Sequence, residues 1–333
     1  MSKLIDQRVP DYDNRRKFFK QYYHWQLKTE DCDPAMFLLN YIFRRLELNS
    51  EQRYWISFLY ANTYQLPTAW IMANEFPDFE KVDVDRLTNW NKENLKELKY
   101  QVDNKWQKGH LPAMFISYRD NVLKTGNQEQ FFLSLCQEDT EQKNFEVVSK
   151  YIIKNFYKMG RYIMWFYLQT LRETCDLPVL PTSLLLKDKS SSSHAKGLLF
   201  ALGMDDVANE KELNFDQDVW DFLDEEAASI LQEMKEEYPD VKVDYFTMET
   251  SLCSFKKIFR ESHGRYLGYY LDRQAEDIYV CQNNKRWRGI DWDLLHDGRE
   301  QFIDKRLINK EVNKDIFGEL GRTGTIRYIN WFK

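Results

Sequence analysis

The sequence predicts a mainly α-helical protein with a minor β element. Its 333 residues include only 12 glycines and 8 prolines, and this scarcity favours long helices over sheets of many strands. Apolar residues recur at helical spacing along most of the chain. Strand character is confined to three short segments, at 241–248, 278–281 and 325–332. The fold class that follows is a multi-helix architecture of two lobes, without internal repeats.

The chain is long enough for two or three lobes, and a hydrophobic content of 43% can fill their cores. We expect an N-terminal arm, a helical lobe and a second helical lobe that holds an acidic segment and a basic helix. The expected bounds are 1–30 for the arm, 31–186 and 195–333 for the lobes, 204–240 for the acidic segment and 249–278 for the basic helix. The intervening KDKSSSSH, 187–194, has the composition of a mobile loop.

Helix signals in the first lobe are clear. Asp33-Pro34 combines a capping side chain with a proline suited to the first helical position, and that helix should reach about Leu46. Asn49 or Ser50 opens the next helix, which ends before Pro67. Further helices are expected at 68–75, from Asp83 to about Tyr100, and again from Pro112.

The remaining helices are predicted by periodicity. Residues 141–171 form one or two helices, with Gly160 near the middle. Residues 194–203 form a short helix that Gly203 ends. The acidic segment continues with a helical pattern up to Pro239.

Several function classes lack their signatures. No P-loop, GxGxxG, GxSxG or kinase signature is present, and neither the five cysteines nor the five histidines show metal-ligand spacing. We therefore expect reduced thiols and no transition metal. No run is apolar enough for a bilayer and the first ten residues lack a signal-peptide core, which predicts a soluble cytoplasmic protein.

Charge is distributed unevenly. The net charge is −6, but 204–240 alone holds 14 Asp/Glu and 2 Lys, so the rest of the chain is basic. An acidic lobe beside a basic body is compatible with nucleic acid bound on one face, and also with a solvated acidic helix. Residues 1–30 interleave cations with aromatics, either to contact nucleic acid or to lay an aromatic face on the core.

The stretch 249–278 has the highest concentration of candidate functional side chains. Wound as a helix, it sets Leu267, Leu271 and Ile278 on an apolar face. The opposite face gathers polar groups and a glycine, namely Arg265, Gly268, Tyr269, Asp272 and Glu276. Lys256, Lys257 and Arg260 add cations upstream, which suits an anion such as phosphate. An ordinary amphipathic surface helix is the structural alternative.

Two further segments have the composition of an anion site. Lys105, Lys108, His110 and Arg119 surround Trp106, close to the N-terminus of the helix expected from Pro112. A turn with solvated lysines explains the same pattern. Arg161, Trp165 and Gln169 follow at i, i+4 and i+8 and so form one row.

A family resemblance extends this interpretation. The blocks RRLELNSEQRYWISFLYANTY, AWIMANEFPDF, DRLTNW, KGHLPAMFISYRD, GRYIMWFYLQTL and ETSLCSFKK…GRYLGYYLDRQAEDI occur in order over about 30–330. Together they resemble the bacteriophage alpha-glutamyl/putrescinyl-thymine pyrophosphorylases, or amino acid:DNA transferases. The related hydroxymethyluracil DNA kinases share part of the pattern, but the missing P-loop argues against kinase activity.

The resemblance implies a reaction on phage DNA in the bacterial host cytoplasm. The DNA would contain 5-hydroxymethyluracil activated as a pyrophosphate ester, and an amine from an amino acid or a polyamine would displace the pyrophosphate. No cofactor is implied, although a divalent cation would suit the leaving group. The family has been related to the helix-hairpin-helix DNA glycosylase fold, whose LxxxGxG hairpin has only a loose echo here in HAKGLLFALG.

This chemistry needs a base, an anion clamp and stacking groups. Asp272 is the preferred base, with Glu249 and Glu276 as stand-ins, although Asp272 could simply pair with Arg265 or Arg273. The cations expected to bind pyrophosphate or DNA are Arg53, Lys108, His110, Arg161, Lys256, Lys257, Arg265 and Arg273. The aromatic residues expected to stack on the base are Trp55, Trp106, Trp165 and Tyr269. The tryptophans could equally be core residues. A glycosylase-like base-excision enzyme and a non-catalytic DNA-binding module of a modification complex are the alternative functions.

Overall fold

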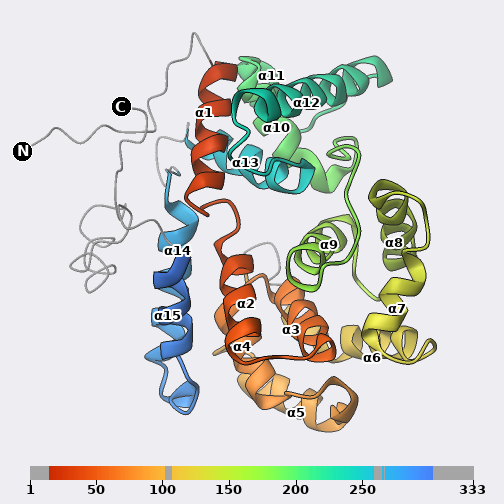
Figure 1. Cartoon of the computed structure of the whole chain (residues 1–333), viewed down its shortest axis with the longest axis vertical. Helices are drawn as coiled ribbons and strands as arrows, with labels where there is room; N and C mark the ends of the chain where they lie inside the picture. The colour runs from red at the N-terminus through yellow and green to blue at the C-terminus, as the bar shows by residue number, and fades with distance from the viewer. Residues whose placement is uncertain (1–14, 102–106, 259–264, 266, 303–333) are drawn as a thin grey trace, which may run out of the picture. The chain divides into compact units, whose positions relative to one another are not determined.

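The computed structural model describes residues 15–101, 107–258, 265 and 267–302, and within them all regular structure is helical (Figure 1). The mainly α prediction is confirmed. Strands predicted at 241–248 and 278–281 are wrong, and 325–332 lies outside the described residues. The first error has a local cause, because Asp244 accepts a hydrogen bond from the Thr247 amide (3.0 Å) and so caps a helix where the sequence alternates.

Two compact units divide the chain. Unit 1 draws on Met1–Pro34, Thr182–Glu276 and Glu300–Lys333, and unit 2 on Ala35–Pro181 and Asp277–Arg299. This division differs from the expected one in two ways. The described part of the N-terminal segment, from residue 15, groups with unit 1, and residues 277–299 group with unit 2.

Unit 2 begins with helices whose starts follow the capping signals. They are α2 (Pro34–Arg45), α3 (Ser50–Thr63), α4 (Leu66–Glu75) and α5 (Val84–Asn94). Asn49 and Gln52 form a capping box at the start of α3, and Asp83 caps α5. Tyr64 ends α3 in a left-handed conformation, with φ of 48°. The predicted helix starts at Pro34, Asn49 and Asp83 are therefore confirmed, although α5 ends before Tyr100.

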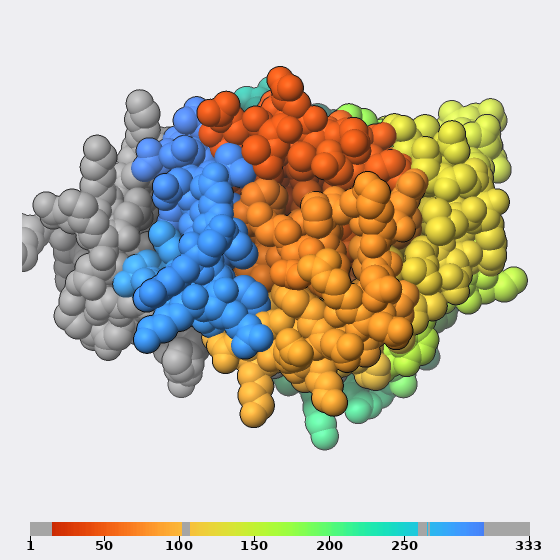
Figure 2. All heavy atoms as spheres, turned by 90° about the horizontal axis from the view of Figure 1, so that it is seen from below, coloured from red at the N-terminus to blue at the C-terminus, as the bar shows by residue number. Residues whose placement is uncertain are grey.

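The rest of unit 2 packs around α3 and α9. Its helices are α6 (Leu111–Val122), α7 (Gln128–Leu135), α8 (Glu141–Asn155) and α9 (Arg161–Cys175). Gly160 is the N-cap of α9, so residues 141–171 form two helices. In Figure 2 the blue atoms of the returning C-terminal segment lie against the orange atoms of the first third of the chain. The contact is close at Gly298, where a Cβ would lie 2.3 Å from Leu38.

Unit 1 contains α1 (Arg15–Lys28), α10 (Ser192–Ala201), α11 (Asp205–Ala208), α12 (Gln217–Glu237) and α13 (Tyr245–Ile258). The short helix predicted at 194–203 is confirmed, and Gly203 after it has φ of 75°. The segment expected as a mobile loop is ordered from 189 onward, as a 3-10 turn (Lys189–Ser191) followed by α10. The core of unit 1 brings aromatic residues of α1, including Phe19, Tyr22 and Tyr23, against the inner faces of α10, α12 and α13.

The basic helix expected over 249–278 is two helices. α13 ends at Ile258, and α14 (Tyr269–Gln282) starts after Gly268, whose φ is 93°. The Asp31 carboxylate accepts the amide hydrogens of Gly268 (2.8 Å), Tyr270 (2.9 Å) and Leu271 (3.1 Å), and so fixes the first turn of α14. Since α14 begins at Tyr269, the expected helical row from Arg265 to Glu276 does not form. α14 passes from unit 1 to unit 2 after Glu276, and α15 (Asp293–Phe302) follows.

Candidate functional site

A close contact between two helices of unit 1 positions the candidate site. α10 and α13 cross at Gly197, where a Cβ atom would lie 2.2 Å from the Leu252 carbonyl oxygen, so only glycine permits this approach. One turn before Gly197, α10 carries Ser193 and His194. These two side chains consequently face α13 at Glu249 and Cys253.

Glu249, Cys253 and Lys257 form one row along α13, because they are spaced by four residues. The Lys257 Nζ lies 3.2 Å from the Cys253 Sγ, and the Ser193 Oγ lies 3.3 Å from the same sulfur. The His194 Nδ1 lies 3.3 Å from the Glu249 Oε1, and both residues are buried. The two facing helices thus bring a thiol, an imidazole, a carboxylate and an ammonium group together.

A buried arginine completes this cluster. Arg265 is 9% exposed, and its backbone amide donates to the Lys257 carbonyl oxygen (3.0 Å). Its guanidinium lies 4.7 Å and 4.6 Å from the ring centroids of Tyr269 and Tyr270 and donates to the Tyr270 hydroxyl. Burial alone would lower the pKa of Arg265, but the neighbouring phenols and the Cys253 sulfur raise it, so the cation is retained.

The electrostatic effect is strongest at Cys253. Burial would raise the pKa of this thiol, but a hydrogen bond from His194 and the charges of Lys257, His194 and Arg265 outweigh it. The pKa of Cys253 is therefore held well below its usual value. We define the thiol cluster as Ser193, His194, Glu249, Cys253, Lys257 and Arg265.

Two buried carboxylates that follow α1 contact α13 and the start of α14. Asp31 is fully buried, and burial raises its pKa to about 7 even though three backbone amides donate to it. Asp33 accepts from the Thr250 hydroxyl (3.1 Å). Together they anchor the end of α1 to α13 and α14.

Of the predicted catalytic carboxylates, only Glu249 belongs to the thiol cluster. Asp272 lies on the first turn of α14 and adds to the negative field at Asp31. Glu276 pairs with the exposed Arg273 (2.7 Å). Among the predicted cations of unit 1, Lys257 and Arg265 contact the cluster, while Lys256 is half-buried on α13.

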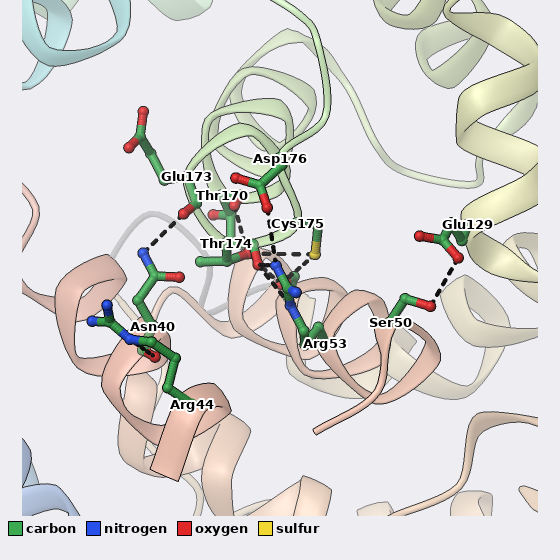
Figure 3. Close-up of polar contacts among 11 residues, drawn as sticks. Asn40, Arg44, Ser50, Arg53, Glu129, Thr170, Glu173, Thr174, Cys175 and Asp176 are labelled. Carbon is green, nitrogen blue, oxygen red and sulfur yellow. Dashed lines mark hydrogen bonds and ion pairs between the residues drawn. The ribbon is translucent and has the colours of Figure 1, made fainter. Parts of the chain in front are cut away.

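The predicted site residues of unit 2 have local structural contacts. Figure 3 shows Arg53 directed at the end of α9, where its Nε donates to the Thr174 carbonyl oxygen (3.0 Å). The Lys108 ammonium lies 5.4 Å from the Tyr100 ring centroid. The His110 Nε2 lies 3.0 Å from the Lys158 Nζ. The Arg161 guanidinium lies 4.4 Å from the Trp165 ring, as the helical row predicted.

The predicted stacking groups separate into three cases. Trp55 and Trp165 are each 1% exposed, and the Trp55 indole donates to the Phe76 carbonyl oxygen (2.7 Å), so the structure favours the core alternative for both. Tyr269 is half-buried beside Arg265. Trp106 lies outside the described residues.

Unit 2 also contains a hollow of about 630 Å³ between the start of α3, the 76–82 segment and Arg86. Its charged lining includes both signs, as Glu51, Asp78, Lys81 and Arg86 show. No predicted site residue lines it, and Glu51 is occupied in capping α7 through the Gln128 and Glu129 amides (3.0 Å each). We therefore base the candidate site on the thiol cluster.

Cys253 and His194 were not predicted as site residues. One signal was present in the sequence, since Glu249, Cys253 and Lys257 share the i, i+4, i+8 spacing that was noticed for Arg161. His194 had no comparable signal, because it reaches Glu249 only through the close packing of two helices.

Comparison with known proteins agrees with the resemblance seen in the sequence. The sequence profile of the amino acid:DNA transferase family matches residues 27–263, more than two thirds of the chain. The chain is also 23% identical, over 326 residues, to a serinyltransferase of Salmonella phage ViI, in an alignment that covers 91% of this chain and 77% of the relative. Among the described residues no helix is both long and apolar enough to cross a bilayer. The chain belongs to the amino acid:DNA transferase family, and it is an enzyme that transfers an amino acid to DNA.

Proposed function

We propose that this enzyme displaces pyrophosphate from 5-(pyrophosphoryloxymethyl)uracil in phage DNA with the amine of an amino acid. The new C–N bond would form at the exocyclic methylene, giving a hypermodified thymidine. The observation that carries the proposal is the thiol cluster, whose members from Ser193 to Lys257 all lie in the region that the family profile matches. Arg265 follows two residues beyond that region.

Departure of pyrophosphate requires positive charge that is already in place when the C–O bond breaks. Lys257 and Arg265 supply it in our proposal. Arg265 is suited to this task because its guanidinium is buried and lies against two phenol rings. Lys256, Arg273 and the cations of unit 2 would then contact DNA phosphates.

The amine must lose a proton before it can attack, and a second after the C–N bond has formed. We assign this proton transfer to His194, whose Nδ1 lies 3.3 Å from the Glu249 Oε1. His194 therefore replaces Asp272 as our first choice of base. Glu249 is a positioning residue in this scheme. Asp272 remains the alternative base, whereas Glu276 pairs with the exposed Arg273 and takes no part in this scheme.

The amine is proposed to be an amino acid, with serine the first to test because the phage ViI relative is named a serinyltransferase. A polyamine is the alternative within the same chemistry. Tyr269, beside Arg265, is the described aromatic residue that we retain for contact with the uracil ring.

The test is mass spectrometry of nucleosides after the enzyme has been incubated with activated DNA and single candidate amines. We expect a nucleoside with the mass of the amine adduct, together with one pyrophosphate released per transfer. DNA with unactivated 5-hydroxymethyluracil is the matched control and should remain unchanged. Adding a chelator to one arm tests for a divalent cation.

Two other results would redirect the proposal. Free base and abasic sites would indicate a glycosylase-like enzyme. Salt-dependent binding of DNA without any change in mass would indicate a non-catalytic module. Either result with every amine would contradict the proposed displacement.

A further inference from the structure

Cys253 differs from the other four cysteines in its surroundings. Cys32 and Cys281 are buried, and burial raises the pKa of Cys32 well above its usual value and that of Cys281 to about 12. Cys136 and Cys175 are partly exposed, yet burial still raises the pKa of Cys136 to about 12 and that of Cys175 to about 11. Only Cys253 combines partial exposure with a lowered pKa. It is the cysteine whose surroundings favour the thiolate, because the Lys257 ammonium lies 3.2 Å from its sulfur.

The geometry around this sulfur is that of an activated nucleophile. An ammonium lies 3.2 Å and a hydroxyl 3.3 Å from the Sγ, and both are within hydrogen-bonding reach. His194 comes from a separate helix, and its Nδ1 lies 3.3 Å from the Glu249 Oε1, so a carboxylate stands beside the ring and can pair with it once the imidazole is protonated. The glycine at 197 lets α10 approach α13 closely enough for this arrangement.

The proposed substrate has an electrophile that suits a thiolate. Carbon 6 of a uracil ring is conjugated to the C4 carbonyl, so a nucleophile that adds there leaves an enolate. An enolate next to the C5 methylene can expel a leaving group from that methylene. Cations beside the sulfur would stabilise the negative charge that develops.

We propose that Cys253 is a covalent nucleophile in the transfer, an inference that rests on the proposed function. The Cys253 sulfur bonds to C6 of the activated uracil, and the electrons of the C5–C6 double bond move onto O4. The enolate then reforms its carbonyl, makes a double bond from C5 to the exocyclic methylene and expels pyrophosphate with the C–O electron pair. The product of this half-reaction is a 5-methylene base bound to the enzyme through sulfur.

The second half-reaction uses the amine. Its nitrogen adds to the methylene, the electrons return to O4, and the enolate expels the Cys253 thiolate from C6, which restores the ring double bond. The two protons released by the ammonium pass through His194 to solvent. No oxidant, reductant or further reactant is needed, and the enzyme returns to its initial state.

The decisive experiment omits the amine. Wild-type enzyme and a short activated DNA are mixed in equal amounts, denatured and separated, and any protein–DNA adduct is digested and mapped by mass spectrometry. We expect pyrophosphate release and an adduct at Cys253, and adding the amine should discharge that adduct to modified DNA. Pyrophosphate release and transfer with no adduct at any time, at rates equal to those of Cys253→Ala, would overturn the proposal.

Variants give a second measure. We expect Cys253→Ala and Cys253→Ser to lower the rate of transfer by about 10³-fold or more, with circular dichroism unchanged. Cys175→Ser is the matched control, since Cys175 is also partly exposed, and it should transfer at the wild-type rate. Transfer by Cys253→Ala within a few-fold of wild type would contradict the covalent role while leaving the proposed function intact. A wild-type enzyme that leaves activated DNA unchanged would overturn both.

Chemical labelling keeps the test independent of mutation. Iodoacetamide at pH 7 should alkylate Cys253 faster than any other cysteine and abolish transfer, and bound activated DNA should protect it. Alkylated Cys253 with full transfer activity would overturn the proposal.

Discussion

Two charge-dense regions of unit 1 have opposite organisation. On the face where α1 meets α12, cations of one helix pair with carboxylates of the other. The pairs are Arg16 with Glu226 and Glu233, and Lys20 with Glu233 and Glu237. In the thiol cluster, by contrast, the Lys257 ammonium contacts the Cys253 sulfur, and the charge of Arg265 also lowers the pKa of that thiol. The first region pairs each cation with carboxylates, whereas the second concentrates positive charge at a reactive atom.

This difference shows why counts of charge could not locate the site. The acidic segment 204–240 and the cations of 1–30 indicated either a nucleic-acid surface or ordinary helix faces. The structure favours the second interpretation, because α1 buries its aromatics and uses its cations to hold α12. The groups that a charged side chain contacts, and not the number of charges in a segment, distinguish a structural role from a catalytic one.

The largest expected effect on the thiol cluster is the loss of transfer activity when the Glu249 carboxylate is removed. Glu249→Gln keeps the side-chain volume but removes the negative charge that lies beside the His194 ring. We expect transfer to activated DNA to fall by about 10²-fold or more, with the unfolding free energy nearly unchanged. The measurement is the rate of nucleoside formation, followed over pH to show that the ionisation governing the rate has moved.

Glu276→Gln is the matched control, since Glu276 also pairs with a cation, the exposed Arg273. It should transfer within a few-fold of wild type. A full rate for Glu249→Gln together with a large loss for Asp272→Asn would return the base to α14, where the sequence had indicated it.

The second effect concerns the helix crossing. In Gly197→Ala the new Cβ would lie 2.2 Å from the Leu252 carbonyl oxygen, so α10 must move away from α13. Overpacking of this kind costs about 1–3 kcal/mol, which denaturant unfolding can measure. Because His194 moves with α10, alkylation of Cys253 at neutral pH should also slow.

Gly289→Ala is the control for this change, because no atom lies within 4 Å of the Cβ that it would add. It should leave both stability and alkylation unchanged. Equal stability for the two variants would mean that the α10–α13 contact is not the tight packing on which the thiol cluster depends.

The sequence predicted much of the fold because helix starts are local. Asn49 and Asp83 cap helices through amides three residues ahead of them, and α2 begins at Pro34, as the proline predicts. The break at Gly268 was missed because its cause is remote. Asp31, more than 230 residues earlier, accepts the amides that start α14.

The site was only partly predictable for the same reason. Glu249, Lys257 and Arg265 were identified from the residue types of one stretch. Cys253 could be recognised as a candidate only from the structure, in which α10 places Ser193 beside its sulfur and His194 beside Glu249. The reactivity of a thiol is difficult to predict from a sequence, because its pKa depends on spatial neighbours that the spacing of cysteines does not reveal.

The smallest expected effect concerns the ion pairs between α1 and α12. Burial would raise the pKa of Glu233, but hydrogen bonds and charges from Arg16 and Lys20 lower it to about 2 from an ordinary value of 4.5. A carboxylate whose folded pKa is lowered stabilises the protein above pH 4.5, and this contribution is lost as the pH falls toward 2. The Glu233 side chain is 34% exposed, so solvent screens the pairs, and we expect Glu233→Gln to cost about 1 kcal/mol at pH 7.

Urea unfolding at pH 7 and at steps between pH 5 and pH 2 measures this contribution. The difference in unfolding free energy between wild type and Glu233→Gln should shrink as the pH falls through this window, and salt should reduce it at pH 7 because exposed pairs are screened. Transfer activity at pH 7 should not change, because these pairs stabilise the α1–α12 face without touching the thiol cluster. A Glu233→Gln variant that lost transfer as strongly as Glu249→Gln would show that the two charged regions are not functionally distinct.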